Sequence, residues 1–429
     1  MLGAAATLAA AALALTACGS GSAGSESDSS ADGGKVTMTF WHNSTTGDGK
    51  AYWEATAADF MAANPNVTIE VSAIQNEEMD GKLQTAMNSG DSPDIFFARG
   101  GKKLADVVDA GMAMDITDKL TDETKANVKE GAFDAFKIDG KIYGMPVSVL
   151  PGGIYYSKDL FAQAGITETP TSMDELNAAI DKLKAAGIQP IALGAKDAWP
   201  AAHWYYFFAL RECSQDVFTK APAEGDYSDP CWLKAGEDLQ ELAGTEPFND
   251  GFLTTSAQQG AGSSAGLVAN HKAAMELMGA WNVGVIADLT PDKKPLADLG
   301  WFPFPAVDGG EGDPNALMGG VDGWSCAADA PKECVDFLNF FMQTEYQEKY
   351  AEAFQTIPAN VEAQSGVQQE TLQEIMKSYN NASYVSMWLD TQLGQNVGSA
   401  LNVGVVDMLA GKGDAQGILD AVQAAADKE

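Results

Sequence analysis

The hydrophobic positions of this chain alternate between the spacing of a strand and the spacing of a helix. The residues from Val36 to Trp41 are β-branched and aromatic at strand spacing. A helical face follows, formed by Trp53, Ala57, Phe60 and Met61. The same alternation continues with strands over 67–73 and 94–97 and helices over 78–88 and 102–110. This order predicts a mostly parallel sheet covered by helices.

Two features then interrupt the alternation. Ile138-Asp-Gly-Lys-Ile142 has the pattern of a hairpin with a two-residue turn. The strand-like segment from Met145 to Tyr156 contains Pro151-Gly-Gly153, which is an unfavourable interior for a single strand. We therefore expect this segment to pass from one lobe of the protein to another.

A second unit of strands and helices begins after this segment. Ser172-Met-Asp-Glu175 is a capping box that opens a helix running to Ala186, and Gly187 ends it. Further strands are predicted over 190–193, 274–278 and 299–304, and nearly all of 332–428 has a helical pattern. No repeat of solenoid period is present in the sequence.

Length and charge narrow the possible functions. The chain has 429 residues and is 45% hydrophobic, which favours a large core in two domains or one two-lobed unit. Its 26 Lys and Arg against 60 Asp and Glu give a net charge of -34. Because such a surface repels phosphate groups, nucleic acid and anionic membrane surfaces are not expected as partners.

The N-terminal residues have the pattern of an export signal. Leu2 to Ala17 is an apolar run shorter than the roughly 20 residues that a membrane-spanning helix needs. It ends in Leu15-Thr-Ala-Cys18, which resembles the lipobox of bacterial lipoproteins, whose Cys is lipidated after cleavage. No Lys or Arg precedes the run, so the cationic segment that is typical of such signals is missing. The alternative is a buried Cys18 in an Ala-rich helix. Residues 19–35 are rich in Gly, Ser and acidic residues, as in a flexible tether.

The remaining cysteines fit an oxidising compartment outside the membrane. Of the three possible pairings, the simplest joins sequence neighbours, Cys213 with Cys231 and Cys326 with Cys334. A metal site is the alternative. It has little support, because no C-x-x-C motif occurs and the histidines are widely separated, at His42, His203 and His271. We expect two disulfides and no metal site.

Six phrases occur in an order that resembles a known family. They are Thr39-Phe-Trp-His42, Ser92-Pro-Asp-Ile-Phe96, Asp139-Gly-Lys-Ile-Tyr-Gly-Met-Pro146, Ile154-Tyr-Tyr-Ser-Lys-Asp-Leu-Phe161 with Ala164-Gly165, Pro170-Thr-Ser-Met-Asp-Glu-Leu176 and Lys272-Ala-Ala-Met-Glu-Leu-Met-Gly-Ala-Trp281. Together they resemble the extracellular solute-binding proteins of ABC importers, in particular the carbohydrate-binding group related to maltose-binding proteins. The resemblance extends from Val36 to the C-terminus.

The resemblance implies an α/β fold, the periplasmic-binding-protein-like fold, with two lobes, a hinge and an interlobe cleft. By this similarity, lobe one comprises 36–147 plus 299–356, and lobe two comprises 148–298 plus 357–429. The chain would cross between them near 145–149, 295–300 and 356–358. Residues 1–18 would form the signal peptide.

The resemblance also implies the function. The protein would bind a neutral di- or oligosaccharide outside the cell membrane and deliver it to the membrane permease subunits of an ABC importer. It would be a monomer anchored by lipidated Cys18, with no cofactor and no catalysis. Plant-wall or starch fragments are one expectation for the sugar.

A sugar site needs aromatic platforms for the apolar ring face and fixed polar groups for the hydroxyls. Ligands of open α/β sheets bind beyond strand ends, which favours Trp41, His42, Asn43 and Arg99. The resemblance adds Tyr155, Trp281, Trp388 and Asp390, and places Asp322 and Trp324 in a Gly-rich turn facing the cleft. Trp199, His203 and Trp204 form a cluster that could wall the cleft. Plain core packing is the alternative for each aromatic residue.

An enzyme is the main alternative function. A lipoprotein glycoside hydrolase would use two paired carboxylates, which a chain with 60 acidic residues could supply. Gly262-Ser-Ser-Ala-Gly266 matches the G-x-S-x-G elbow of serine hydrolases. That elbow needs a preceding strand, but the residues before it are polar and Gly-rich, so we interpret the motif as a helix-entry loop. A cell-surface adhesin would show repeats or sandwich strands, which the sequence lacks.

Overall fold

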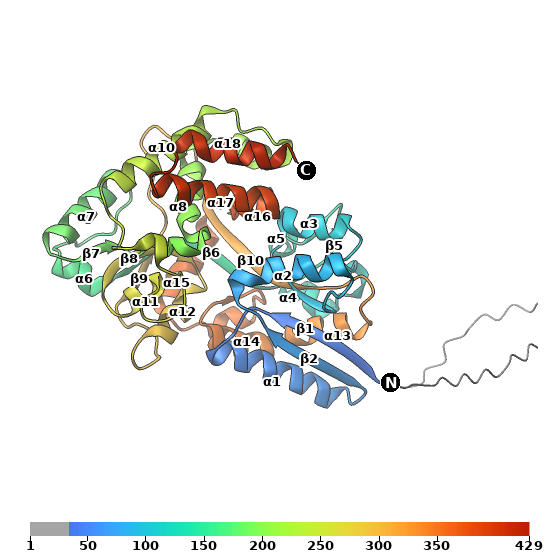
Figure 1. Ribbon diagram of the computed structural model, residues 1–429. Coiled ribbons are helices and arrows are strands. Elements are labelled where there is room, and N and C mark those ends of the chain that lie inside the picture. Colours follow the sequence, from blue (N-terminus) through green and yellow to red (C-terminus); the bar gives the residue numbers. More distant parts are fainter. Residues whose placement is uncertain (1–33, 429) are drawn as a thin grey trace, which may run out of the picture. The chain divides into compact units, whose positions relative to one another are not determined.

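The structure is a computed structural model that describes residues 34–428 (Figure 1). The predicted signal peptide, Cys18 and nearly all of the predicted tether lie outside the described residues. No helix among residues 34–428 combines the length and the apolar character needed to cross a membrane.

The first part of the chain alternates strands and helices as predicted. Three strands alternate with three helices: β1 (Val36–His42), α1 (Gly47–Ala63), β2 (Val67–Ala73), α2 (Asn76–Ser89), β3 (Ile95–Ala98) and α3 (Gly101–Asp109). Strand β1 lies between β2 and β3 and is parallel to both. The face of α1 that was predicted to be apolar is buried at Trp53, Ala57 and Phe60.

The main sheet continues through both parts of the chain. Its order is β2-β1-β3-β10-β6-β8-β7, and β9, β11 and β12 pair with strands on this path. The further strands are β6 (Met145–Ser157), β7 (Gln189–Ile191), β8 (Ala273–Gly279), β9 (Leu299–Phe302), β10 (Leu317–Cys326), β11 (Ile357–Pro358) and β12 (Val385–Met387).

The sheet is mixed, so the prediction of a mostly parallel sheet was wrong. Strand β10 runs antiparallel to both β3 and β6, and β6 runs antiparallel to β8 and β9. The long strands β6 and β10 carry the chain across the sheet, and each pairs with strands of opposite direction. Strand–helix alternation indicates only how consecutive elements are arranged. It could not predict that β10, which lies much later in the chain, pairs with β3 and β6.

Strand β6 is continuous despite its Pro-Gly-Gly interior. Its first half pairs with β10, and Gly152 to Tyr156 pair with β8. Each half therefore has partners of its own, which keeps the strand extended across Pro151 and the two glycines. This arrangement agrees with a segment that passes between two parts of the molecule.

The predicted hairpin is confirmed. Strands β4 (Lys137–Ile138) and β5 (Lys141–Ile142) pair antiparallel, and the two turn residues between them, Asp139 and Gly140, have φ of 50° and 78°. Both positive values match the turn type that Asp-Gly favours.

Helices fill the remainder of the chain. The α-helices are α4 (Asp122–Asn127), α5 (Glu130–Asp134), α6 (Lys158–Gln163), α7 (Met173–Ala185), α8 (Trp199–Glu212), α9 (Gln215–Glu224), α10 (Pro230–Gly244), α11 (Ser264–Ala269), α12 (Asn282–Leu289), α13 (Glu333–Phe341), α14 (Thr344–Phe354), α15 (Glu370–Asn381), α16 (Leu389–Leu393), α17 (Gln395–Leu409) and α18 (Ala415–Ala426). Four short 3-10 helices are η1 (Thr117–Lys119), η2 (Ala195–Asp197), η3 (Phe252–Thr254) and η4 (Ala363–Gly366). Ser172 caps α7 as predicted, because its Oγ accepts a hydrogen bond from Glu175 N at 3.3 Å.

The buried side chains form three hydrophobic clusters. The first cluster joins β1, α1, β3 and α13 around Trp53 and Phe337. The second gathers around α8, α10 and α17, and the third lies under α11, α12 and α15. Trp301 and Phe302 of β9 belong to these last two clusters, whereas the sequence analysis assigned β9 to lobe one. The exact lobe boundaries stay a prediction.

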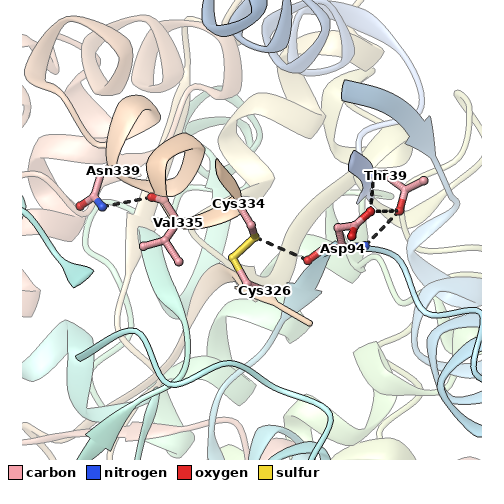
Figure 2. Close-up of a disulfide and its surroundings, with 6 residues drawn as sticks. All are labelled: Thr39, Asp94, Cys326, Cys334, Val335 and Asn339. Atoms are coloured by element: carbon pink, nitrogen blue, oxygen red, sulfur yellow. Dashed lines mark hydrogen bonds between the residues drawn. A yellow bond between two sulfur atoms is a disulfide. The ribbon is translucent and has the colours of Figure 1, made fainter. Parts of the chain in front are cut away.

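Both predicted disulfides are present. Cys213 at the end of α8 joins Cys231 of α10, and Cys326 of β10 joins Cys334 of α13. Figure 2 shows the second bond next to Asp94, whose backbone carbonyl lies 3.5 Å from Cys334 Sγ. The Asp94 carboxylate accepts hydrogen bonds from Thr39 N and Thr39 Oγ1 at 2.7 and 2.9 Å. The disulfide thus fastens α13 beside the pairing of β1 with β3.

Candidate functional site

Four aromatic side chains from separate segments meet in one cluster, which we call the aromatic cluster. Trp199 and His203 lie one turn apart on α8, Trp281 precedes α12, and Trp388 precedes α16. The His203 ring stacks on the Trp388 ring with centroids 4.3 Å apart and planes 9° apart. Trp281 lies 5.8 Å from Trp388 and 6.0 Å from Trp199. Two residues predicted from the sequence, Trp281 and Trp388, are therefore neighbours in space.

The rings of the cluster lie against glycines of the sheet. A Cβ atom at Gly279 would come within 2.0 Å of the Trp281 ring, and one at Gly152 within 2.5 Å of the Trp388 ring. A Cβ atom at Gly320 would lie 2.7 Å from Trp388 Nε1. Gly152 and Gly279 face each other on β6 and β8, and Gly320 lies on the neighbouring strand β10. Glycine is required at these three positions because any other residue would displace an indole.

This close packing corrects one prediction. The segment from Gly319 to Trp324 was expected to form a Gly-rich turn facing the cleft, but it is the middle of strand β10. Glycines mark turns in most sequence contexts. In β10 a glycine makes room for Trp388 instead.

The protonation state of His203 follows from its burial. Its side chain is 3% exposed, and burial lowers its pKa to about 4, against the opposing effect of Asp390. The imidazole is therefore neutral at neutral pH. His203 Nδ1 and the indole nitrogens of Trp199 and Trp281 are buried without a hydrogen-bond partner among residues 34–428. The cluster thus combines apolar ring faces with ring nitrogens that form no hydrogen bond to residues 34–428.

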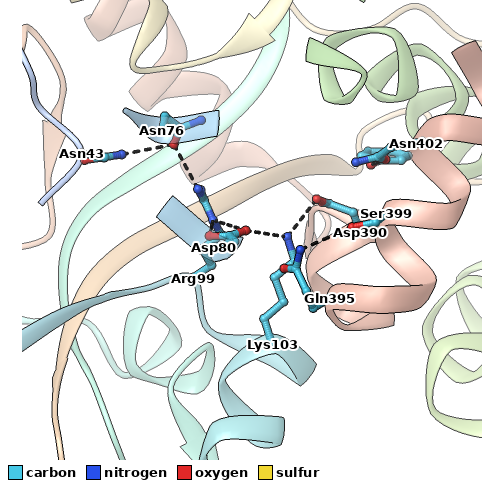
Figure 3. Close-up of polar contacts among 10 residues, drawn as sticks. Asn43, Asn76, Asp80, Arg99, Lys103, Asp390, Gln395, Ser399 and Asn402 are labelled. Carbon is cyan, nitrogen blue, oxygen red and sulfur yellow. Dashed lines mark hydrogen bonds and ion pairs between the residues drawn. The ribbon is translucent and has the colours of Figure 1, made fainter. Parts of the chain in front are cut away.

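A chain of polar side chains runs from Asn43, after the end of β1, to Asp390 on α16 (Figure 3). Asn43 Nδ2 donates to Asn76 Oδ1 at 3.3 Å, and an Arg99 guanidinium nitrogen donates to the same oxygen at 3.0 Å. Arg99 Nε lies 2.9 and 3.1 Å from the two carboxylate oxygens of Asp80. The guanidinium also lies over the Phe97 ring, 4.8 Å from its centroid. Arg99 is thereby held in one orientation.

The polar chain ends on helix α16. Lys103 Nζ lies 3.4 Å from Asp80 Oδ2 and 3.1 Å from Asp390 Oδ2. Asp390 follows Trp388 by two residues, so the ion pairs connect the strand ends near Asn43 with the aromatic cluster. The predicted residues Asn43, Arg99 and Asp390 belong to one network.

Charge and burial oppose each other in this network. Burial tends to raise the pKa of Asp80, but Arg99 and Lys103 outweigh it and lower that pKa. For Arg99 burial acts to lower the pKa, and Asp80, Asp322 and Asp390 outweigh it and raise the pKa. Burial raises the pKa of Asp322 to about 6 despite the nearby Arg99. Asp322 is thus protonated at a higher pH than Asp80.

Three predicted residues lie inside the packed core. His42 is fully buried, its Nδ1 accepts from Ser44 N at 3.2 Å, and burial lowers its pKa to about 4. Tyr155 is fully buried and donates to the carbonyl of Gly279 at 3.1 Å. Trp324 packs against Trp53, and its Nε1 donates to the Trp41 carbonyl at 3.3 Å. We leave these three side chains out of the candidate site because the core already surrounds them.

The three residues predicted to wall the cleft divide between two faces of α8. Trp199 and His203 are four residues apart and share the face that carries the aromatic cluster. Trp204 is 1% exposed and packs against Phe248 and Phe304 in the core. One step along a helix rotates the side chain by about a quarter of a turn, which explains the different surroundings of Trp204.

Two hollows lie beside the polar network. One has a volume of about 470 Å³ and lies among α2, β3, α3 and the start of α17, with Arg99 and Lys103 on its rim. The other, of about 620 Å³, is more open and is lined by Trp41, Glu77 and other residues of α2. No member of the aromatic cluster lines either hollow. Trp41 thus lines one of these hollows, whereas Trp281 and Trp388 line neither.

Sequence analysis missed three members of the polar network. Asn76 and Asp80 lie on α2, and Lys103 lies on α3. Nothing in the sequence distinguishes Asp80 among 60 acidic residues. Their position within the first five residues of the helices that follow β2 and β3 was the available signal, because such helices begin at the ligand-facing edge of the sheet.

The G-x-S-x-G motif opens a helix, as interpreted from the sequence. Ser263 is the N-cap residue of α11, and its Oγ accepts from Gly266 N at 3.1 Å. Ser264 Oγ donates to the Ala257 carbonyl at 3.0 Å. His271 is engaged elsewhere, with its Nε2 3.0 Å from both carboxylate oxygens of Asp298. A catalytic serine–histidine pair is therefore not formed by these residues.

Asp159 also lies near the hydrogen-bonded pair of His271 and Asp298. The ligand atoms of Asp159, His271 and Asp298 all lie within 4.8 Å of one another. The sequence analysis had treated the histidines as isolated, because residues this far apart in sequence gave no sign of the proximity. Burial tends to raise the pKa of Asp298, but hydrogen bonds from Ser157 and His271 lower it overall.

Comparison with known proteins agrees on one family. Residues 43–348 match the family described as bacterial extracellular solute-binding protein. A solved chitin oligosaccharide binding protein is similar with a TM-score of 0.83 and 26% identity, over 92% of this chain and 98% of that one. A structure from work on xylan utilization by Caldanaerobius polysaccharolyticus gives a TM-score of 0.82 and 26% identity, over 90% and 99% of the two chains.

Curated relatives match over shorter stretches. A Brucella abortus protein named as a binding protein is 31% identical over 49% of this chain, which spans only 50% of that relative's length. The diacetylchitobiose binding protein DasA of Streptomyces coelicolor is 25% identical over 79% of each chain.

Proposed function

We propose that this chain, which belongs to the family of bacterial extracellular solute-binding proteins, binds a neutral di- or oligosaccharide and releases it unchanged. The two-lobed α/β fold is that of its structural relatives. The named ligands of two relatives, chitin oligosaccharide and diacetylchitobiose, support a sugar as the solute.

The aromatic cluster is the observation that carries this proposal. A pyranose has an apolar C–H face, and an indole supported from behind by the sheet is a rigid platform for it. Gly279 and Gly152 leave room for Trp281 and Trp388 close to the strands, so both indoles are held in place and little conformational entropy is lost when a sugar binds. The neutral ring of His203 stacks on one face of Trp388 without adding a charge.

The polar network would supply hydrogen bonds to the sugar hydroxyls. Arg99 presents a planar fork of donors, and its orientation is fixed by Asp80 and Asn76. Asn43 and Asp390 add an amide and a carboxylate along the same line of contacts. Trp41 and Asp322 lie beside this network. We propose these residues, with Trp281 and Trp388, as the ligand contacts.

The transport role is a further part of the proposal. Solute-binding proteins of this family serve ABC importers, and relatives are named as ABC transporter extracellular-binding proteins. We propose that the loaded protein docks as a monomer on the permease subunits outside the membrane, and that lipidated Cys18 anchors it there.

A sugar panel tests the proposal directly. Chito-, xylo- and malto-oligosaccharides and raffinose would be screened by thermal shift, because a ligand that binds only the folded state raises its apparent stability. A rise of several degrees with one class, confirmed by calorimetry, is expected. Chromatography after incubation should recover that sugar intact. Cleaved sugar would establish a hydrolase instead, and a panel without any shift would reject the sugar ligand.

A further inference from the structure

Lysine 103 connects two parts of the molecule that have separate hydrophobic cores. It lies on α3, whose Leu104 belongs to the first cluster. Its partner Asp390 lies on α16, whose Leu389 and Leu393 belong to the second cluster. The ion pair, with Nζ 3.1 Å from Oδ2, therefore spans the boundary between the cores.

This ion pair is better shielded from water than the other lysine pairs of the structure. The side chains of Lys103 and Asp390 are 14% and 16% exposed. By contrast, Lys220 and Asp216 within α9 are 57% and 73% exposed. Exposed pairs contribute little because water screens them, whereas removing one partner of a shielded pair leaves an uncompensated charge.

The backbone around the pair is closely packed as well. A Cβ atom at Gly101 would lie 3.0 Å from the carbonyl oxygen of Thr391, so α3 and α16 approach each other at a glycine. Among residues 34–428, Asp390 has Lys103 as its one ion-pair partner, whereas Asp80 also pairs with Arg99. Loss of Lys103 would thus remove the ion-pair partner of Asp390 and leave it only the longer-range attraction of Arg99, while Asp80 stays paired.

We infer that Lys103 is a positioning residue that links the two halves of the molecule. Its ammonium group links Asp80 of the first half to Asp390 of the second half. Because Asp390 lies two residues after Trp388, the link also fixes the position of the aromatic cluster relative to Arg99. The inference does not depend on which solute is bound.

Small-angle scattering of the ligand-free full-length protein tests this inference. Lys103→Met should increase the radius of gyration, because the link between Asp80 and Asp390 across the two halves is lost. Hydrogen exchange of α16 should become faster, by about fivefold or more. Lys103→Arg should restore both quantities, since arginine keeps the charge. Lys220→Met is the matched control, and it should leave both quantities at the wild-type values.

Two further measurements distinguish the loss of a specific link between the halves from a general loss of stability. Asp390→Asn should open the protein to the same extent, and the double variant should open no further than either single variant. Added salt should open the wild type and leave Lys103→Met unaffected. Wild-type scattering in Lys103→Met, or additive effects in the double variant, would overturn the inference. Failure of the sugar panel would reject the proposed function alone.

Discussion

Single glycines determine where the indoles of the site can lie. Trp281 and Trp388 each occupy space that a Cβ atom would fill at Gly279, Gly152 or Gly320. The two tryptophans were predicted from the sequence, whereas Gly152 was interpreted as part of a crossing segment, Gly320 as part of a turn, and Gly279 was given no structural role. A glycine in the sequence shows only that a position has no side chain. The three-dimensional structure is needed to show which neighbouring residue packs into that space.

Loss of the Trp281 ring should weaken binding more than folding. The ring is half-buried and contacts the three other rings of the aromatic cluster, so Trp281→Ala should lower sugar affinity at least tenfold. The free energy of unfolding should fall by only about 1 kcal/mol. Calorimetry and chemical denaturation on the same variant measure the two effects.

A core tryptophan gives the control for this experiment. Trp232 is 1% exposed and far from the cluster in the packing of α10. Trp232→Ala should cost roughly 3–5 kcal/mol of stability, while the folded fraction binds sugar normally. If Trp281→Ala behaved like Trp232→Ala, Trp281 would be a core residue and the platform would lie elsewhere.

Histidine 203 should make stability depend on pH. Its pKa is lowered from 6.5 to about 4 by burial, so the unfolded state binds more protons between these values. The stability contribution is therefore complete above pH 6.5 and is lost as the pH falls toward 4. The expected loss is on the order of 3 kcal/mol. Glu276, whose pKa burial raises to about 7, acts in the opposite direction.

The comparison with His203→Gln isolates this effect. Denaturation at pH 7, 6, 5 and 4 should show the wild type losing its advantage over the variant as the pH falls. The contributions of His42 and Glu276 cancel in the difference, because both proteins contain them. A difference that stays constant across this range would show that His203 remains accessible to protons in the folded state.

At the scale of elements, the sequence predicted helices, strands and turns that depend on neighbouring residues. It did not predict the pairing of strands that lie far apart in the chain. Strand β2, helix α7 and the hairpin β4–β5 follow from alternation, capping and turn chemistry within a few residues. Strand β10 pairs with β3 and β6, which precede it by more than 150 residues along the chain. The glycines of β10 allow close packing against those distant strands and against Trp388. Sequence patterns within β10 alone therefore did not identify it as a strand.

A substitution in strand β10 tests whether Gly320 is needed for the position of the Trp388 ring. Gly320→Ala should push the Trp388 ring away from the strand, since the new Cβ would lie 2.7 Å from Nε1. We expect sugar affinity to fall by about tenfold, with a modest loss of stability from overpacking. Gly244→Ala at the end of α10 meets no atom within 4 Å and is the control. Unchanged affinity in Gly320→Ala would mean that Trp388 can shift without consequence for the sugar.

At the scale of the whole molecule, two long strands tie the hydrophobic clusters together. Strand β6 pairs with β10 at one end and with β8 and β9 at the other, and β10 also pairs with β3. Neither half can therefore unfold without breaking hydrogen bonds in a strand that the other half uses. Two-lobed proteins joined by flexible linkers lack this coupling, and their domains can melt separately.

We therefore expect a single cooperative unfolding transition for residues 34–428, with equal calorimetric and van't Hoff enthalpies. Phe337→Ala removes a fully buried ring from the first cluster and should cost roughly 3–5 kcal/mol. Because the halves are coupled, this change should lower the Tm of the entire transition and leave its shape unaltered. Scanning calorimetry of both proteins decides the question. Two peaks, with only the lower one shifted by Phe337→Ala, would show that the pairing of β6 and β10 does not couple the two lobes. The lobes would then unfold independently.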